Sequence, residues 1–285
     1  MEIEAFLNLQ LFLPMKVKYI EVPSQKIAYY ESEGEGTPVL FVHGNSASGR
    51  AFQKQLERDL GRQYRLVAMD LPGHGDSPMA SDPQTYTLPG YARVVVETAE
   101  ALEMADAVFV GWSLGGHLLL EAADDLEAAG ILIFGTPPLA DPPAMADAFL
   151  ENPAVNVGFT ANVTEEMARQ YAQSFLAPGA STDPTPFVQD ILRTYGGARQ
   201  TLGGSVQPGG YKDEVKVVAR MNTPLAVIHG AQEQLINGDY IQQMEMPSLW
   251  RGELQLIENA GHAPQWEQPE RFNELLAAFI NEVTD

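Results

Sequence analysis

The residues best suited to chemistry begin with a serine between a strand pattern and a helix pattern. Residues 111–115 read G-W-S-L-G, directly after the apolar run 106–111 and before a segment with helical spacing. A serine in G-x-S-x-G at such a junction lies on a tight turn that exposes its hydroxyl, and small flanking residues are needed because backbone crowds the turn. The N–H of Leu114 and the positive end of the helix then face an oxyanion. The pattern predicts Ser113 as nucleophile and Leu114 as an oxyanion donor.

A serine hydroxyl is a weak nucleophile until a positioned base takes its proton, so a histidine must follow. His262 lies in the loop E-N-A-G-H-A-P, after the last strand-like run and before the final helical segment, where an imidazole can reach back over a sheet. We expect it to be the general base; a loop histidine satisfied by water is the alternative. The other four histidines favour local hydrogen bonding or burial over catalysis, His117 among them one helical turn beyond Ser113: His43, His74, His117 and His229.

The acid that orients the base is expected to precede His262, because enzymes built on this turn follow the order serine, acid, histidine. In I-H-G-A-Q-E-Q-L-I-N the only carboxylate near the strand end is Glu233. A glutamate can orient an imidazole and stabilise its charged form. A solvated loop glutamate is the alternative, with Asp239 and Glu258 as replacement acids flanking the same crevice.

A second oxyanion donor is expected in H-G-N-S-A-S at 43–48, which follows the strand-like run 38–42. The backbone N–H of Asn45 would pair with that of Leu114. The Asn45 side chain either contacts substrate or only shapes the turn.

The elements that must hold these residues alternate between strand and helix patterns. Short β-rich runs open the chain at 16–22, 26–32 and 38–42. Apolar runs expected to be buried parallel strands follow at 65–70, 106–111, 130–135, 224–230 and 253–258. Helical spacing occurs at 51–60, 91–102, 114–126, 239–246 and 269–283. This alternation predicts a doubly wound α/β sheet with right-handed crossovers.

The interval 137–222 breaks the alternation, because its helix-like stretches at 165–176 and 186–195 are joined by Pro- and Gly-rich segments without a comparable strand. We expect a helical insertion there, a core domain over 15–136 and 223–285, and an N-terminal extension over 1–14. No histidine spacing is typical of a metal site, so neither a metal nor another cofactor is expected.

The charge of the chain bears on which kinds of molecule it can bind. The 285 residues carry 38 Asp plus Glu against 17 Lys plus Arg, a formal charge of −21 that argues against nucleic acid. No apolar run reaches the roughly 20 residues of a membrane-spanning helix.

The N-terminal segment and the cysteine content bear on the cellular location. Cysteine is absent, which excludes disulfides and thiolate nucleophiles. Glu2 and Glu4 stand where a secretory signal carries positive charge. We expect a soluble, cytoplasmic protein; an export signal is the alternative. The oligomeric state stays open.

The motifs HGN, DLPGHGDS, GWSLGG, the G-x-x-E at 230–233 and NAGHAP together resemble the α/β-hydrolase superfamily from about residue 16 onward. The resemblance implies a mostly parallel eight-stranded sheet flanked by helices, with a helical cap inserted before the penultimate strand.

A narrower likeness is to the serine-dependent N-acyl homoserine lactone hydrolases, the quorum-quenching lactonases, which use glutamate where most relatives use aspartate. That resemblance implies a Ser113, Glu233 and His262 triad beneath a cap that covers an acyl-binding tunnel. It also places Tyr171 at the substrate. Trp112, beside the serine, is expected to contact the substrate as well, together with Asn45 if its side chain does more than shape the turn.

The resulting prediction is a metal-independent hydrolase that opens the lactone ring through an acyl-enzyme on Ser113 and acts on a small apolar ester or lactone. A general carboxylesterase or a C–C bond hydrolase with the same triad is the first alternative. A hydrolase-fold protein that binds ligand without turning it over is the second.

Overall fold

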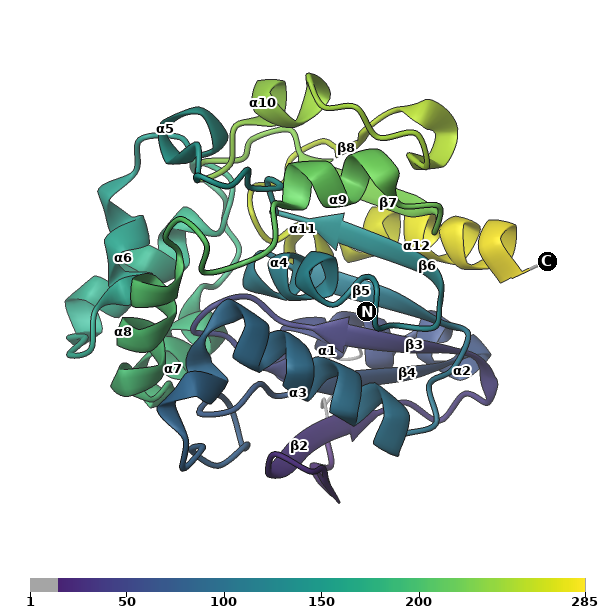
Figure 1. Cartoon of the computed structure of the whole chain (residues 1–285), viewed down its shortest axis with the longest axis horizontal. Helices are drawn as coiled ribbons and strands as arrows, with labels where there is room; N and C mark the ends of the chain where they lie inside the picture. Colours follow the sequence, from purple (N-terminus) through teal and green to yellow (C-terminus); the bar gives the residue numbers. More distant parts are fainter. Residues whose placement is uncertain (1–14, 285) are drawn as a thin grey trace, which may run out of the picture.

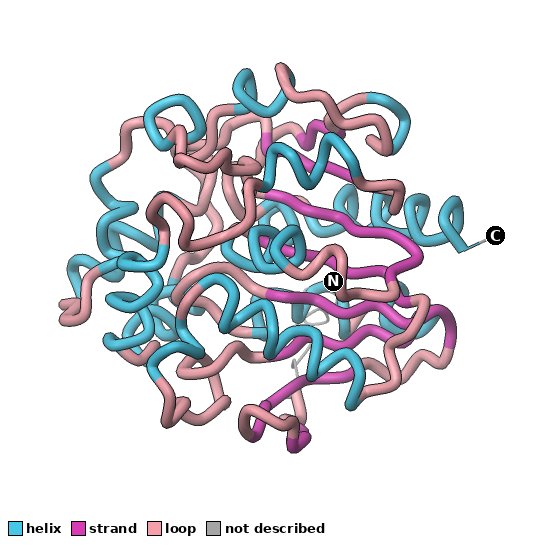
Figure 2. The backbone as a smooth tube through the Cα atoms, in the orientation of Figure 1, coloured by secondary structure: helices cyan, strands magenta, loops and turns pink. Residues whose placement is uncertain are grey.

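A central sheet of eight strands organises the computed structural model, which describes residues 15–284 (Figures 1 and 2). The strands run in the spatial order β1-β2-β4-β3-β5-β6-β7-β8, with β2 antiparallel to both of its neighbours, β1 and β4, and all later neighbours parallel. Their bounds are β1 Lys18–Glu21, β2 Lys26–Glu31, β3 Gly36–Val42, β4 Tyr64–Met69, β5 Ala107–Trp112, β6 Ala128–Phe134, β7 Leu225–Gly230 and β8 Gln255–Ile257. The predicted eight-stranded, mostly parallel sheet is confirmed. The predicted extension 1–14 lies outside the described residues.

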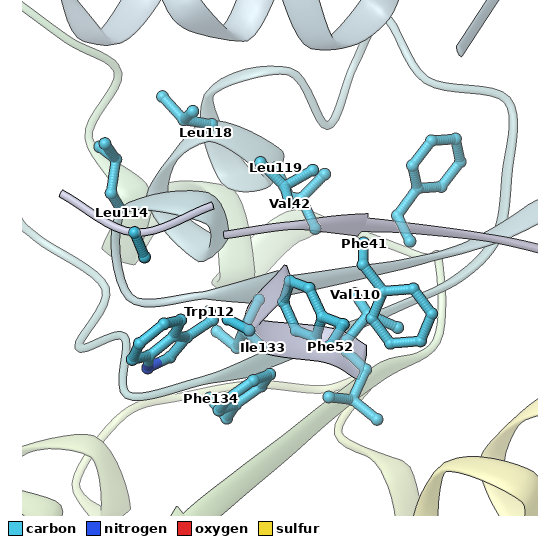
Figure 3. Packing of buried hydrophobic residues seen from close by; sticks show 14 of the residues in the cluster. Phe41, Val42, Phe52, Val110, Trp112, Leu114, Leu118, Leu119, Ile133 and Phe134 are labelled. Carbon is cyan, nitrogen blue, oxygen red and sulfur yellow. The ribbon is translucent and has the colours of Figure 1, made fainter. Parts of the chain in front are cut away.

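The central strands are apolar on both faces because helices cover both faces. Every residue of β5 and of β7 is buried. Figure 3 shows part of this packing, with Leu119 close to Val42, and Trp112 beside Phe134. The last two rings are nearly parallel, with centroids 6.4 Å apart. Such continuous burial supplies most of the driving force for folding and fixes where each strand ends.

Two groups of helices form the outer layers (Figure 1). One face carries α3 (Leu88–Ala101), α4 (Leu114–Glu121) and α9 (Glu214–Arg220), and the other carries α1 (Gln53–Leu56), α11 (Pro264–Glu267) and α12 (Pro269–Thr284). Two further short helices are α2 (Asp59–Gln63), which contacts α1 and β4, and α10 (Gly238–Gln242), which contacts α5 (Met145–Ala148).

Three helix predictions were wrong in extent, one of them over 239–246, where α10 ends at Gln242. The helix expected over 51–60 is broken into a 3₁₀ turn at Gly49–Phe52, then α1 and α2, because Arg58 is extended at φ −106° and ψ −170°. The helix expected over 114–126 ends at Glu121.

The interval between β6 and β7 is helical, as the sequence predicted. It contains α5 (Met145–Ala148), a 3₁₀ turn at Pro153–Phe159, α6 (Glu165–Ser174), α7 (Thr185–Arg193), α8 (Gly196–Ser205) and α9. Figure 1 shows α6, α7 and α8 gathered at one end of the sheet, whereas α9 lies over the sheet beside α4. We therefore propose that the cap consists of α5 to α8, and that α9 belongs to the core although it lies within 137–222.

Hydrogen bonds tie the cap to loops at the carboxyl ends of the core strands. Ser48 Oγ donates to the buried Asp190 carboxylate of α7 at 2.6 Å. Arg193, at the end of the same helix, donates to Asp76 at 2.7 Å. The cap is thus held directly above the loops that carry the candidate site.

Candidate active site

Ser113 occupies the sharp turn that its motif predicts. It follows β5 and precedes α4 with φ 53° and ψ −116°, a conformation that a non-glycine residue rarely adopts. The neighbouring glycines make the turn possible: a Cβ on Gly111 would lie 2.6 Å from Gly116 Cα, and one on Gly115 would lie 2.0 Å from the Val42 carbonyl oxygen. The sequence therefore supports a strained serine at the carboxyl end of the central strands.

His262 and Glu233 come together from loops after β8 and β7. His262 Nδ1 lies 2.8 Å from Glu233 Oε2, and both side chains are only 3% exposed. The other carboxylate oxygen accepts from the backbone N–H groups of Gln234 and Leu235, each at 2.9 Å. These bonds fix the carboxylate, which in turn holds the imidazole with Nε2 as the nitrogen left for proton transfer.

The electrostatics of the pair favour an ionised acid. Burial raises the pKa of the Glu233 carboxyl, but the charge and the hydrogen bond of His262, together with the N–H of Leu235, outweigh burial and bring the pKa below its usual value. A carboxylate kept ionised in a buried position stabilises an imidazolium beside it. The two replacement acids are both exposed and hydrogen-bond to no histidine: Asp239 and Glu258.

Two backbone N–H groups are available where an oxyanion is expected. Among the described residues, neither Asn45 N nor Leu114 N donates to a protein acceptor. The Asn45 side chain is fixed instead, because its Nδ2 donates to the Gly158 carbonyl of the cap at 2.7 Å and its Oδ1 accepts from Ser46 at 3.1 Å. Asn45 thus joins the predicted oxyanion loop to the cap.

A cavity of about 540 Å³ brings these residues together, within the usual size of small-molecule sites. Its polar lining consists of Asn45, Ser113, His117, Tyr171, Gln200 and His262. Most of the remaining lining is apolar and comes largely from the cap and the loops below it: Leu88, Leu114, Leu139, Met145, Phe149, Val155, Phe159, Leu202, Val206, Leu235 and Ile236. The site can hold an apolar chain next to a nucleophile.

The two aromatic residues expected at the substrate lie in different places. Tyr171 of α6 lines the cavity, and a Cβ on Gly158 would lie 2.8 Å from its hydroxyl and 2.9 Å from Asn45 Nδ2, so the two polar groups are close. Burial raises the pKa of the Tyr171 hydroxyl, which stays a neutral donor. Trp112 is buried behind the cavity and is absent from its lining. Its indole N–H donates to the His262 carbonyl at 2.8 Å, so the geometry gives Trp112 a positioning role and no substrate contact.

The remaining histidines differ in their surroundings. His43 is buried between the Gly44 carbonyl and the Leu71 N–H, and burial holds its pKa well below the usual value. His74 bonds to the Pro72 carbonyl, and burial lowers its pKa to about 4. His117 is buried and bonded to Glu214, as expected of it, but it also lines the cavity, which the sequence did not indicate. Within residues 15–284, no group of three or more His, Asp or Glu side chains is placed to hold a metal ion.

The chain belongs to the alpha/beta hydrolase family, whose model matches residues 39–275. Relatives of this fold act on ester bonds. A serine on a strand-to-helix turn and a histidine held by a carboxylate are features that the serine hydrolases of this fold share.

Particular relatives refine this class. The chain is 36% identical to the N-acyl homoserine lactonase AidH, of which a mutant was solved in complex with N-hexanoyl homoserine lactone, with a TM-score of 0.90 over 95% of this chain and 99% of that one. It is 26% identical to a pimeloyl-[acyl-carrier protein] methyl ester esterase of Vibrio vulnificus over 88% of this chain and 97% of the esterase. It is 25% identical to a non-heme chloroperoxidase of Kitasatospora aureofaciens over 89% of this chain and 95% of that protein.

Proposed function

We propose that this protein hydrolyses the lactone ring of N-acyl homoserine lactones. The observation that carries the proposal is that Ser113 and the Glu233-bound His262 line one mostly apolar cavity. Such a cavity suits a substrate with a small polar head and an acyl chain. The likeness to AidH supports the choice of lactone over other esters, because AidH is described with N-acyl homoserine lactone and with the ring-opened N-acyl homoserine.

The reaction would have two steps, the formation of an acyl-enzyme on Ser113 and its hydrolysis, and His262 would act as base and then as acid in both. Ser113 Oγ attacks the lactone carbonyl carbon while His262 takes the hydroxyl proton, and Glu233 stabilises the imidazolium. The oxyanion accepts from the N–H groups of Asn45 and Leu114. Collapse breaks the bond to the ring oxygen, which receives the proton from His262. The product is an acyl-enzyme ester whose new hydroxyl remains attached to the same molecule.

The second half repeats these roles with water. His262 takes a proton from water, the hydroxide attacks the ester carbonyl, and His262 returns the proton to Ser113 Oγ as the acyl group leaves. The amide bond to the acyl chain stays intact throughout. The hydroxyl of Tyr171 makes no hydrogen bond to another described residue and lines the cavity, so we assign it to the polar atoms of the substrate.

Mass spectrometry of the products tests this proposal. With N-hexanoyl homoserine lactone, ring opening adds the mass of one water and leaves one product. An amidase would instead release homoserine lactone and hexanoic acid, and that outcome would contradict the proposal. Because the mechanism needs no metal, a chelator should leave the rate unchanged.

A general carboxylesterase with the same triad is the second candidate, and the esterase relative of Vibrio vulnificus favours it. Hydrolysis of p-nitrophenyl esters without lactone opening would establish this alternative. A protein that only binds ligand would show neither activity and no labelling of Ser113 by a fluorophosphonate. We also propose a cytoplasmic location; among residues 15–284 there is no helix of the length and hydropathy needed to cross a bilayer.

A further inference from the structure

His117 is one of two polar residues of the cavity lining, with Gln200, that the proposed reaction leaves without a role. Its Nδ1 lies 2.8 Å and 3.0 Å from the two carboxylate oxygens of Glu214. Glu214 is completely buried, and one of its oxygens also accepts from the N–H of Leu139 at 2.7 Å. The cavity therefore contains a second histidine held by a buried glutamate, in addition to His262.

The imidazole of His117 keeps one nitrogen for a ligand. Because the Glu214 carboxylate is an acceptor, Nδ1 carries the shared proton. Among the described residues Nε2 has no hydrogen-bond partner, and it is not one of the unpartnered atoms that are closed off from solvent. His117 also lines the cavity. A polar atom of this kind, oriented by a buried partner, can bind a polar group of a ligand.

We infer that His117, oriented by Glu214, binds a hydroxyl group on the third carbon of the acyl chain. The inference rests on the proposed function, since it concerns the substrate of the same cavity. A hydroxyl suits this nitrogen in either state of the ring, because it donates to a neutral Nε2 and accepts from a protonated one. Aliphatic carbon alone offers the nitrogen no partner.

The spacing on α4 selects the third carbon. Ser113 precedes α4 with non-helical dihedral angles, but its carbonyl accepts from the N–H of His117 at 3.3 Å, so the His117 backbone lies one helical turn, about 5.4 Å, farther along the axis. The third acyl carbon is five bonds from the lactone carbonyl that Ser113 attacks. Backbone atoms three bonds apart span about 3.8 Å, so five extended bonds span about 6 Å. Hence a chain lying along α4 brings its third carbon to His117.

A purely structural pair is the competing explanation, because Glu214 begins α9 and His117 belongs to α4. The competing explanation predicts that loss of the pair weakens the protein and affects all substrates equally. Our inference predicts a change in preference between two substrates that differ only in one hydroxyl.

The test compares kcat/KM for N-(3-hydroxyhexanoyl) homoserine lactone with that for N-hexanoyl homoserine lactone. The unmodified enzyme should prefer the hydroxylated substrate, and a ratio of one or below would overturn the inference without any variant. In His117→Phe combined with Glu214→Gln, which leaves no charge buried alone, the ratio should fall about tenfold, the usual effect of one hydrogen bond. An equal loss for both substrates would identify the pair as structural and refute the inference.

Gln200→Leu is the matched control, since it removes a different polar side chain from the same lining. Its ratio should equal that of the unmodified enzyme; a fall as large as in the His117 variant would assign the hydroxyl to Gln200. If no lactone is opened, the proposed function fails by itself. Calorimetric binding of the two uncleaved lactones then decides: tighter binding of the hydroxylated one supports the inference, and equal binding overturns it.

Discussion

Replacing Glu233 by Gln should abolish most activity while the fold is retained. A glutamine oxygen can keep the two hydrogen bonds from the N–H groups of Gln234 and Leu235. Its amide nitrogen would then lie where Oε2 now accepts from His262 Nδ1 at 2.8 Å. Because that nitrogen is a donor, Nδ1 must become the acceptor, and the ring proton moves to Nε2. The imidazole in this tautomer cannot take the proton of Ser113.

The expected loss is large in kcat and small in stability. A carboxylate-to-amide change that imposes the wrong tautomer lowers kcat about 10⁴-fold, equivalent to about 5 kcal/mol in the activation free energy. Loss of one charge-assisted hydrogen bond lowers the free energy of unfolding by about 1.5–3 kcal/mol. Steady-state hydrolysis of p-nitrophenyl butyrate and denaturant unfolding measure the two quantities.

Asp239→Asn is the matched control for the same chemical change. Asp239 is exposed at the start of α10. Its backbone N–H donates to the Asn237 side chain, and among the described residues its carboxylate has no hydrogen bond to a histidine. Its kcat should stay within about twofold, as for a surface substitution. A loss below about tenfold in the Glu233 variant, or a larger loss in the Asp239 variant, would refute the reasoning.

Three other perturbations test separate parts of the structure. Ser113→Ala should lower kcat by several orders of magnitude and abolish fluorophosphonate labelling, with an unchanged circular dichroism spectrum. Gly115→Ala should lower the free energy of unfolding by about 1–3 kcal/mol, because its Cβ would meet a backbone oxygen at 2.0 Å, whereas Gly204→Ala, with nothing within 4 Å, should not. Burial raises the pKa of Asp190 to about 6. The folded state therefore binds a proton that the unfolded state lacks between about pH 4 and 6, and the contribution of this carboxyl, at most about 3 kcal/mol, is lost as pH rises through 6. Asp190→Asn should remove that pH dependence from urea unfolding curves.

The sheet could be predicted because burial on both faces leaves a plain mark in the sequence. The runs 106–111 and 224–230 are apolar almost throughout, and they became β5 and β7 with bounds shifted by one residue. Helices of the cap were harder to predict from the sequence. The segment G-G-A-R-Q-T-L-G-G-S forms α8 despite four glycines, and no apolar period predicts it. Tertiary contacts with the core loops, rather than intrinsic preference, hold such a segment in a helix.

The candidate site also contains residues that the sequence could predict and residues that it could not. Ser113, Glu233 and His262 could be proposed because the motif around Ser113 and the chain order serine, acid, histidine are typical of this fold, and the structure brings Glu233 and His262 together. Glu214 could not be found. It lies 97 positions from His117, and only the folded chain places a buried carboxylate at that imidazole. Nor could the sequence show that Trp112 lies outside the cavity lining. That depends on which face of β5 carries the side chain into the buried core, and only the folded structure determines it.

One consequence follows from α4 itself. The proposed nucleophile Ser113 directly precedes α4, and the proposed oxyanion donor Leu114 and His117 lie in its first turns; every residue of this helix is buried. A helix advances about 1.5 Å per residue and returns to the same face only after three or four residues. The distance between the reacting carbonyl and a group that this helix binds farther along the acyl chain can therefore take only certain values, set by the helical turn. A residue of this helix that binds a different position of the acyl chain is therefore expected about one turn nearer to Ser113 or farther from it.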